Sequence, residues 1–231
     1  MSLNFIFDCF GTLIDTGMGS IEATARILKN VDANENADAF YKEWKDIKKK
    51  MMYEHPSRNE KTLFELSLGE MFLKYGIKAD ASKEVEPMIR TLFSQRIVFP
   101  ETRELLHGLD DKGVEYAIGS TTDTDSILHY LSLNKLNIKK IYTSEDMQVY
   151  KPDPLFYTTI LKSCGWNVDE CIFVGDNLID DIKGPQSIGM KTVLIDRNRK
   201  YRESDVMPDY VINSLLELND INSSLTEERQ C

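Results

Sequence analysis

Cysteine and histidine are scarce in this sequence, and long apolar runs are missing from it. The 231 residues include four cysteines and three histidines, and no two cysteines have Cys-x-x-Cys spacing. We therefore expect neither a disulfide framework nor a zinc centre. No apolar run approaches the roughly 20 residues that cross a bilayer, and the N-terminus lacks the pattern of a signal peptide. These features predict a reduced, cytoplasmic protein without a membrane partner.

Positive charge is also in short supply. The sequence has 28 lysine and arginine residues against 38 aspartate and glutamate residues, which gives a formal net charge of −10. Binding to a phosphate backbone needs a clustered basic surface, so we expect no nucleic-acid partner. Hydrophobic residues make up 42% of the chain, which at this length is enough for a substantial core. The oligomeric state has no recognisable signal in the sequence.

Short apolar runs alternate with helical patterns in most of the chain. The alternation predicts parallel βαβ units and therefore an α/β fold with a Rossmann-like parallel sheet. Strands are expected directly before Asp8 and at 114–119, 140–143, 171–174, 191–195 and 210–212. Helices are expected at 101–112, 124–133, 154–163, 178–188 and 214–221.

The segment 16–96 has a different pattern, in which no strand is apparent. Its apolar residues recur at helical spacing and predict helices at 20–31, 36–53, 59–75 and 81–95. We therefore expect two domains: an α/β core made of residues 1–15 and 97–231, and an inserted helical cap domain at 16–96. The linkers near 15–19 and 96–100 are expected to let the cap open and close.

Polar side chains follow several of the predicted strands. Because the carboxyl ends of parallel strands meet at one edge of a sheet, these side chains are expected to converge there. A carboxylate nucleophile beside a lysine and a hydroxyl suits attack on an electrophile that carries negative oxygens. Two carboxylates in contact repel each other unless a cation lies between them, and ligation by oxygen alone is typical of Mg²⁺. The residues concerned are Asp8, Thr12, Ser120, Lys151, Asp176 and the adjacent pair Asp180 and Asp181.

These residues lie in four segments whose order resembles that of the haloacid dehalogenase (HAD) superfamily of hydrolases. The first segment is Asp8-Cys9-Phe10-Gly11-Thr12-Leu13, the second is Ser120, the third is Lys151-Pro152-Asp153-Pro154, and the fourth is Gly175-Asp176-Asn177 with Asp181. The helical insertion after the first segment resembles the cap of the branch that contains small-molecule phosphatases, β-phosphoglucomutase-like mutases and 2-haloacid dehalogenases. The resemblance implies a HAD-like fold.

The resemblance also implies roles for individual residues. Asp8 would be the nucleophile, Ser120 would bind the transferred group and Lys151 would stabilise negative charge, with Thr12 a further hydroxyl of the catalytic set. A Mg²⁺ ion would be held by Asp8, by the backbone carbonyl of Phe10 and by Asp176. Asp181 would orient a metal-bound water or Lys151, with Asp180 as the competing choice for that role.

Phe10 departs from the phosphatase pattern, in which an aspartate two residues after the nucleophile acts as general acid and base. An aromatic residue there resembles the dehalogenases, as do Tyr157 and the segment Trp44-Lys45, although Lys45 stands where that family has an arginine. Asp176 argues against dehalogenation, because those enzymes work without metal and lack an acidic residue at this position.

Three functions therefore remain open from the sequence. The favoured one is a Mg²⁺-dependent phosphatase that acts on a small phosphorylated metabolite through an aspartyl-phosphate on Asp8. The alternative is a metal-independent 2-haloacid dehalogenase-like hydrolase that acts through an aspartyl ester. A binding or regulatory protein with weak catalysis is the third, and its support is the missing acid at Phe10. The identity of the substrate has no recognisable code.

Overall fold

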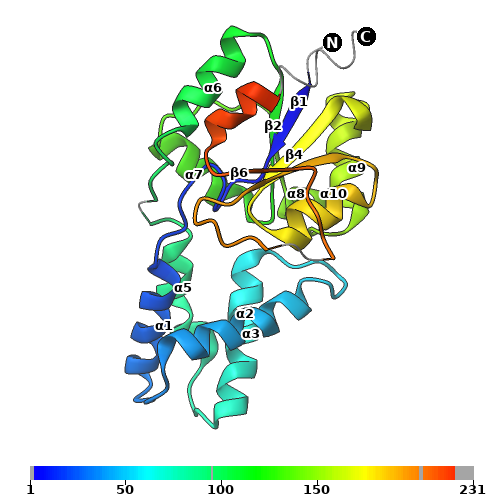
Figure 1. The fold of residues 1–231 in the computed structure, drawn as a ribbon. Helices are drawn as coiled ribbons and strands as arrows, with labels where there is room; N and C mark the ends of the chain where they lie inside the picture. Colours follow the sequence, from blue (N-terminus) through cyan, green and yellow to red (C-terminus); the bar gives the residue numbers. More distant parts are fainter. Residues whose placement is uncertain (1–2, 95, 203–204, 222–231) are drawn as a thin grey trace. The chain divides into compact units, whose positions relative to one another are not determined.

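The apolar run before Asp8 forms a central strand of a six-stranded parallel sheet in the computed structural model (Figure 1). The structure describes residues 3–94, 96–202 and 205–221. The strands have the order β3-β2-β1-β4-β5-β6, and every pair is parallel. Their bounds are β1 Asn4–Phe7, β2 Tyr116–Ser120, β3 Ile141–Thr143, β4 Cys171–Gly175, β5 Lys191–Ile195 and β6 Tyr210–Ile212. The predicted α/β fold is confirmed.

The position of β1 in the sheet follows from its side chains. Phe5, Ile6 and Phe7 are all fully buried, so the strand is apolar on both faces, as a strand covered on both sides must be. The chain adds β2 and β3 on one side of β1, and β4 to β6 on the other. The strand order therefore reverses beside β1, and a ligand site in such a sheet lies at this switch point, beyond the carboxyl ends of the strands.

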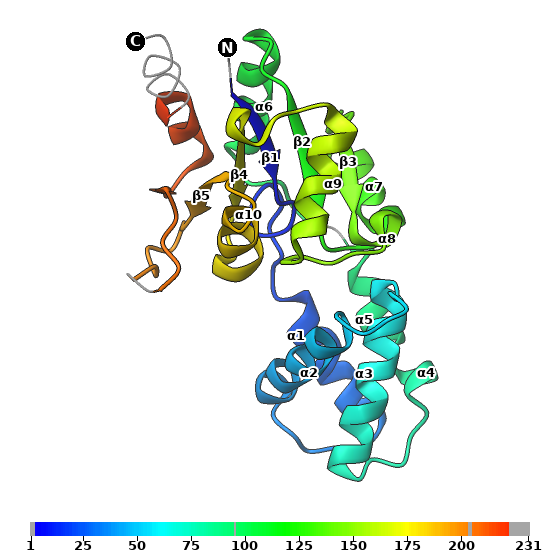
Figure 2. The ribbon, with the colours of Figure 1, turned by 90° about the vertical axis from the view of Figure 1, so that its right-hand side faces the viewer.

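Helix α9 (Pro154–Cys164) covers one face of the sheet (Figure 2). Its side chains Phe156 and Ile160 pack in one buried cluster with Ile6 and Phe173. Burying a side chain of this size contributes about 1.5–3 kcal/mol. The helix begins at Pro154, whose missing amide hydrogen costs nothing in the first turn, after Asp153 caps the amide of Leu155 at 2.8 Å.

The predicted helix at 178–188 is wrong in form, because the structure has a π-helical turn followed by a single short helical turn. The first is η2 (Leu178–Lys183) and the second is α10 (Gly184–Gln186). Pro185 has no amide hydrogen to donate to the preceding turn, so a regular α-helix cannot continue across it. The other helices of this part of the chain are α6 (Thr102–Asp111), α8 (Ser144–Met147), η1 (Val168–Glu170) and η3 (Leu215–Glu217).

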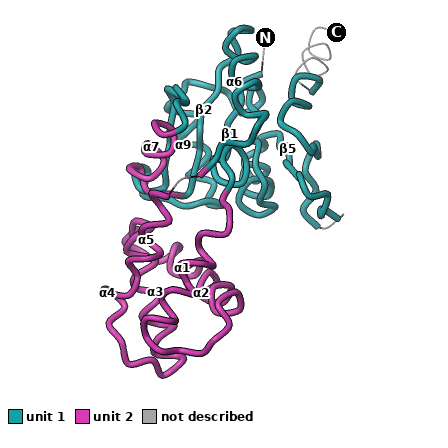
Figure 3. Tube along the Cα trace, turned by 90° about the vertical axis from the view of Figure 1, so that its left-hand side faces the viewer, with its two compact units in different colours: residues 1–15, 97–121, 134–231 teal, residues 16–96, 122–133 magenta. Residues whose placement is uncertain are grey.

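The described residues divide into two units (Figure 3). The first contains the sheet and is made of residues 1–15, 97–121 and 134–231, and the second is made of residues 16–96 and 122–133. Cys231, at the end of the first, lies outside the described residues. That residues 16–96 act as a cap domain on a core of residues 1–15 and 97–231 stays a prediction.

The second unit is built of helices around an aromatic core. The helices are α1 (Gly19–Asn30), α2 (Ala37–Met51), α3 (Glu60–Tyr75), α4 (Ala81–Glu84), α5 (Glu86–Thr91) and α7 (Thr124–Leu133). The single helix predicted at 81–95 is two helices in the structure. Pro87, in the first turn of α5, has no amide hydrogen to donate to the preceding turn, so one regular helix cannot continue across it. Trp44 is buried in this core, and its indole nitrogen donates to the hydroxyl of Ser67 at 2.7 Å. None of the helices within the described ranges is long and apolar enough to cross a membrane.

Candidate active site

Two aspartates follow neighbouring strands at the switch point of the sheet. The amide of Asp8 donates to the carbonyl of Val174 at 2.8 Å, which extends the β1–β4 ladder beyond the end of β1. Asp176 is the first residue after β4. Because β1 and β4 are adjacent and parallel, both carboxylates emerge at the same edge of the sheet.

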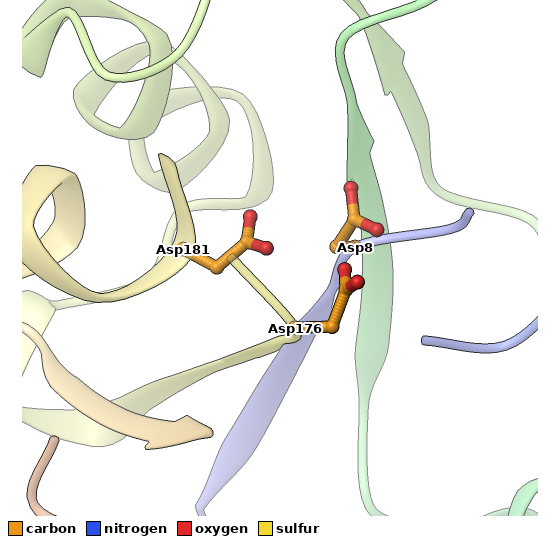
Figure 4. A group of neighbouring side chains, drawn as sticks. All are labelled: Asp8, Asp176 and Asp181. Atoms are coloured by element: carbon orange, nitrogen blue, oxygen red, sulfur yellow. The ribbon is translucent and has the colours of Figure 1, made fainter. Parts of the chain in front are cut away.

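A third carboxylate, from Asp181 in η2, joins these two (Figure 4). One oxygen from each of Asp8, Asp176 and Asp181 lies within 4.8 Å of the others. Asp8 and Asp181 are buried, with exposed fractions of 7% and 1%, and Asp176 is on the exposed side of the group. Three carboxylates at these separations repel one another strongly unless positive charge is present.

Lys151 supplies part of that positive charge. Its Nζ atom lies 2.7 Å from Asp8 Oδ1 and 2.8 Å from Asp181 Oδ1, and the side chain is only 1% exposed. The ammonium group also lies over the ring of Phe173, with 5.0 Å to its centroid. Three carboxylates and one lysine leave a formal charge of −2 in this group, which a divalent cation would balance.

The surroundings shift the pKa values of this group upward. Burial raises the pKa of Asp8 to about 8, with further contributions from Asp181 and Asp176, and the neighbouring Lys151 only partly opposes this. Burial and then Asp181 raise the pKa of Asp176 to about 6. For Lys151, burial alone would lower the pKa, but Asp181 and Asp8 outweigh it and the net shift is upward. The carboxyl groups are therefore not fully compensated by the protein itself.

Two glycines let the carboxylates lie close to the backbone. A Cβ atom on Gly11 would lie 2.5 Å from Asp176 Oδ2, and Gly11 has a φ of +92°, which disfavours other residues. A Cβ atom on Gly175 would lie 2.3 Å from the carboxyl carbon of Asp181. Side chains at either position would displace a carboxylate, so both glycines serve the geometry of the site.

The π-helical turn η2 fixes the orientation of Asp181. Its Oδ2 atom accepts a hydrogen bond from the amide of Asn177 at 2.9 Å, while Oδ1 faces Lys151. The neighbouring Asp180 contributes its backbone carbonyl, which accepts from the hydroxyl of the buried Tyr157. Of the two adjacent aspartates, Asp181 is therefore the one whose side chain contacts Lys151.

The other predicted residues lie at the end of β2 and in the loop after β1. Ser120 is the last residue of β2 and is 1% exposed. Thr12 is fully buried in the loop after β1, and its hydroxyl has no hydrogen-bond partner within the described part of the chain. Phe10 lies in the same loop and is partly buried. The roles of these residues stay predictions.

Sequence reasoning missed Arg197, which binds the loop after β1. Its guanidinium donates to the carbonyls of Gly11 and Thr12 at 2.8 and 2.7 Å. A signal was present, because Arg197 closely follows β5 and strand ends had identified the other site residues. Lys45, by contrast, is an exposed residue of the helical unit, and its ammonium lies over the ring of Tyr41.

The donor set fits a hard divalent cation. Carboxylate oxygens converge in a group of four residues whose formal charge is −2, and burial, with the neighbouring carboxylates adding to it, raises the pKa values of Asp8 and Asp176. Among the described residues, the group consists of aspartates and includes no histidine or cysteine, so the set suits Mg²⁺ better than Zn²⁺.

The chain is similar to several characterised proteins. It is 35% identical over 135 residues to a glyceraldehyde 3-phosphate phosphatase of Methanocaldococcus jannaschii, an alignment that spans 56% of this chain and 58% of that protein. It is 24% identical over 220 residues to (S)-2-haloacid dehalogenase 4A of Burkholderia cepacia, covering 92% and 91% of the two chains.

The fold and the family agree with these similarities. The magnesium-bound structure of the putative HAD-hydrolase YfnB from Bacillus subtilis superposes with a TM-score of 0.79 at 20% identity, over 96% of this chain and 99% of that one. At this identity the superposition establishes the fold, and it confirms the HAD-like architecture predicted from the sequence. The family model for haloacid dehalogenase-like hydrolases matches residues 5–195, a range that includes every predicted site residue. The chain therefore belongs to the haloacid dehalogenase-like hydrolase family.

Proposed function

We propose that this hydrolase is a Mg²⁺-dependent phosphatase that acts on a small phosphorylated metabolite. The observation that carries the proposal is the group formed by Asp8, Asp176, Asp181 and Lys151, with its formal charge of −2. A metal-independent enzyme that binds an anionic substrate would gain nothing from this surplus of negative charge. With a divalent cation bound, the same group would have a formal charge of zero and would no longer repel a phosphate.

Asp8 is the proposed nucleophile. One of its oxygens attacks phosphorus, the bond from phosphorus to the ester oxygen breaks, and the leaving oxygen keeps the electron pair. An aryloxide leaves as the anion, whereas an alkoxide takes up a proton from solvent water. Water then attacks phosphorus in the aspartyl-phosphate, which releases orthophosphate and restores the Asp8 carboxylate. Lys151 lies 2.7 Å from Asp8 Oδ1, where its charge stabilises negative charge on the transferred group. Ser120 and Thr12 are proposed to donate hydrogen bonds to that group.

The residues proposed to hold Mg²⁺ are Asp8, Asp176 and the backbone carbonyl of Phe10. When bound, the ion neutralises negative charge on the phosphate oxygens as a Lewis acid. Asp181 is proposed to hold Lys151 in place, since its Oδ1 lies 2.8 Å from the ammonium group.

Phe10 sets a limit on the chemistry. It cannot donate a proton to the leaving oxygen, and general acid catalysis typically contributes about 10²–10⁴ in rate. We therefore expect the enzyme to hydrolyse esters whose leaving groups need no protonation, such as aryl phosphates, much faster than alkyl phosphates of similar size.

The similarity to known proteins supports two functions, phosphate ester hydrolysis and 2-haloacid dehalogenation. The glyceraldehyde 3-phosphate phosphatase has the higher identity, and the dehalogenase aligns over more of the chain. The magnesium in the YfnB structure supports a metal-dependent function for this fold. Phe10 favours 2-haloacid dehalogenation as the second candidate, since halide leaves as a stable anion without a proton. We rank it second because Asp176 would oppose the binding of a haloacid carboxylate.

Hydrolysis of p-nitrophenyl phosphate tests the proposal. We expect turnover that requires Mg²⁺, stops with EDTA and falls roughly 10³-fold or more in Asp8→Asn, which removes the nucleophile. The matched control is Asp15→Asn, an exposed residue near the start of the chain, which should retain activity. Release of halide from 2-haloacids without metal would overturn the proposal in favour of the dehalogenase, and inactivity toward both substrate classes would favour a binding or regulatory protein.

The proposal extends to the organisation of the chain. Residues 1–15 and 97–231 are proposed as the hydrolase domain, and residues 16–96 as the cap that selects the substrate. The substrate is proposed to be a small anion, and neither a nucleic acid nor a membrane is a proposed partner.

A further inference from the structure

Arg197 is held in place by Phe99 and Glu101, two residues that lie just before α6. Its Nε atom donates to Glu101 Oε1 at 3.0 Å, and its guanidinium carbon lies 3.5 Å from the centroid of the Phe99 ring. Arg197 and Glu101 are both mostly buried, with exposed side-chain fractions of 18% and 16%. An ion pair combined with stacking restricts the guanidinium plane more than either contact alone.

Both terminal nitrogens of Arg197 donate to the loop after β1, and Nη2 also lies 3.0 Å from Glu101 Oε1. Nη1 donates to the carbonyl of Gly11 at 2.8 Å, and Nη2 donates to the carbonyl of Thr12 at 2.7 Å. The carbonyl of Leu13, next in the chain, accepts from the amide of Phe99 and from the hydroxyl of Thr102. Three successive carbonyls of the loop are therefore anchored to the segment 99–102 and to Arg197.

These contacts determine the conformation of Thr12 in particular. The carbonyl of Gly11 belongs to the peptide plane before Thr12, and the carbonyl of Thr12 belongs to the plane after it. Because each plane is held by the same guanidinium, the two backbone dihedral angles of Thr12 are fixed together. Thr12 is β-branched, so its χ1 angle has few accessible rotamers once the backbone is fixed. Arg197 thus restricts, through the backbone, the positions open to the Thr12 hydroxyl.

The Thr12 hydroxyl has a reason to be held in a defined position. It is fully buried, and no hydrogen-bond partner is found for it within the described ranges. A buried hydroxyl without a partner is costly, and such groups in native proteins call for an explanation. Thr12 lies four residues after Asp8, in a loop closed by hydrogen bonds from the amides of Leu13 and Ile14 to the carbonyl of Cys9.

We propose that Arg197 is a positioning residue of the active site, which fixes the Thr12 hydroxyl for a hydrogen bond to the substrate anion. The inference rests on the proposed function for the identity of that anion. The link from Arg197 to Thr12 holds independently of it. Lysine does not replace arginine in this arrangement, because one ammonium group lacks the planar fork that reaches two carbonyls, Glu101 and a ring face together.

The first experiment observes Thr12 without any catalysis. The methyl groups of threonine are labelled with ¹³C, the Thr12 signal is assigned by its loss in Thr12→Val, and three-bond couplings report its χ1 angle. We expect a single rotamer in the unmodified protein and rotamer averaging in Arg197→Lys. The matched control is Arg199→Gln, an exposed arginine two residues away, which should leave the couplings unchanged.

The second experiment is a double-mutant cycle on p-nitrophenyl phosphate hydrolysis. We expect Thr12→Val to lower kcat roughly 10- to 100-fold through loss of a hydrogen bond to a charged group. Arg197→Lys should lower kcat by a similar factor, and by less than about 3-fold when Thr12 is already valine. A contribution of Arg197 to the fold alone would give the same factor in both backgrounds.

The two experiments separate failure of this inference from failure of the proposed function. Unchanged Thr12 couplings in Arg197→Lys overturn the positioning role, whatever the enzyme hydrolyses. Equal kcat losses in both backgrounds also overturn it. Absence of phosphate hydrolysis in the unmodified protein overturns the proposed function, while the couplings still decide whether Arg197 holds Thr12. Thermal unfolding of each variant identifies any that fails to fold, and in that case Glu101→Gln tests the same link by removing the anchor of Arg197.

Discussion

At the scale of single residues, the site contrasts two ways of burying a polar group. Lys151 is as deeply buried as any apolar side chain of the sheet, but its charge is matched by Asp8 and Asp181 at 2.7 and 2.8 Å. Removal of one partner from such a group usually costs about 3–5 kcal/mol, because it leaves a buried charge uncompensated. The Thr12 hydroxyl is buried to the same degree and has no partner within the described residues. This hydroxyl therefore lowers the free energy of unfolding of the ligand-free protein.

Thr12→Val should therefore stabilise the ligand-free protein. The methyl group that replaces the hydroxyl needs no hydrogen bond, and we expect the free energy of unfolding to rise by about 1 kcal/mol in urea denaturation. Thr102→Val is the matched control, since the buried hydroxyl of Thr102 donates to the carbonyl of Leu13 at 2.9 Å. That variant should lose about 1–3 kcal/mol. Equal destabilisation by Thr12→Val and Thr102→Val would show that the two hydroxyls do not differ in hydrogen bonding.

At the scale of elements, the π-helical turn η2 is the feature that departs most from a regular α/β fold. The turn brings Asp181 to Lys151, and it is supported by the Tyr157 hydroxyl, which donates to the carbonyl of Asp180. Gly184, at the junction of η2 and α10, leaves room for this hydroxyl, because a Cβ atom there would lie 2.1 Å from Tyr157 Oη. The three features form one unit: a glycine, a tyrosine of α9 and an irregular turn that places a carboxylate.

Gly184→Ala should disrupt this unit. Because Tyr157 is fully buried, its ring cannot move aside freely, and we expect a loss of about 1–3 kcal/mol in the free energy of unfolding. Gly108→Ala on α6 is the matched control, since nothing lies near its added methyl group, and it should be neutral or stabilise by up to about 1 kcal/mol.

A second substitution identifies the cause of the loss in Gly184→Ala. Tyr157→Phe removes the hydroxyl that the new methyl group would meet, so part of the lost stability should return when both substitutions are combined. A double variant that is no more stable than Gly184→Ala would show that the cost arises elsewhere than at the Tyr157 hydroxyl.

At the scale of the whole molecule, the acidic site couples pH to stability. The pKa of Asp8 is raised by burial to about 8 and that of Asp176 to about 6, whereas both groups would titrate at their ordinary value of 3.8 in the unfolded chain. Between these limits the folded protein binds protons that the unfolded chain has released. The contribution of these two groups to stability is therefore complete below about pH 4 and is lost as the pH rises to about 8.

Binding of Mg²⁺ should reverse this trend. The ion needs deprotonated carboxylates, so its binding releases protons, and its apparent affinity should increase as the pH rises from about 6 to about 8. Isothermal titration calorimetry in two buffers with different ionisation enthalpies measures the protons released. The stabilisation by Mg²⁺ in thermal unfolding should grow over the same range.

The control for this prediction is Asp8→Asn, which removes the group with the higher pKa. Its Mg²⁺ binding should be weaker and should depend less on pH between about 7 and 8. An affinity of the unmodified protein that is constant from pH 6 to pH 8 would show that Asp8 and Asp176 are already ionised, or that the cation binds elsewhere.

The sequence determined the fold and the set of chemical groups. Alternation of apolar runs and helical patterns is a local signal, and Asp8, Ser120 and Asp176 are recognisable because they follow such runs. Lys151 is recognisable because it directly precedes Pro152-Asp153-Pro154. The two predicted helices that proved wrong in form contain Pro87 and Pro185. A hydrophobic pattern predicts which face of a helix is buried. It does not predict where a proline, which lacks an amide hydrogen, interrupts the helix.

Only the tertiary structure decided how these groups are arranged. The contact from Lys151 to Asp8 joins residues 143 apart, and the contact from Arg197 to Thr12 joins residues 185 apart. No local pattern encodes such a pair, because each partner is fixed by the packing of its own element and the two meet only when the sheet has formed. The raised pKa of Asp8, and the lack of a partner for the Thr12 hydroxyl among the residues that the structure describes, arise for the same reason, since both depend on burial by residues distant in the chain.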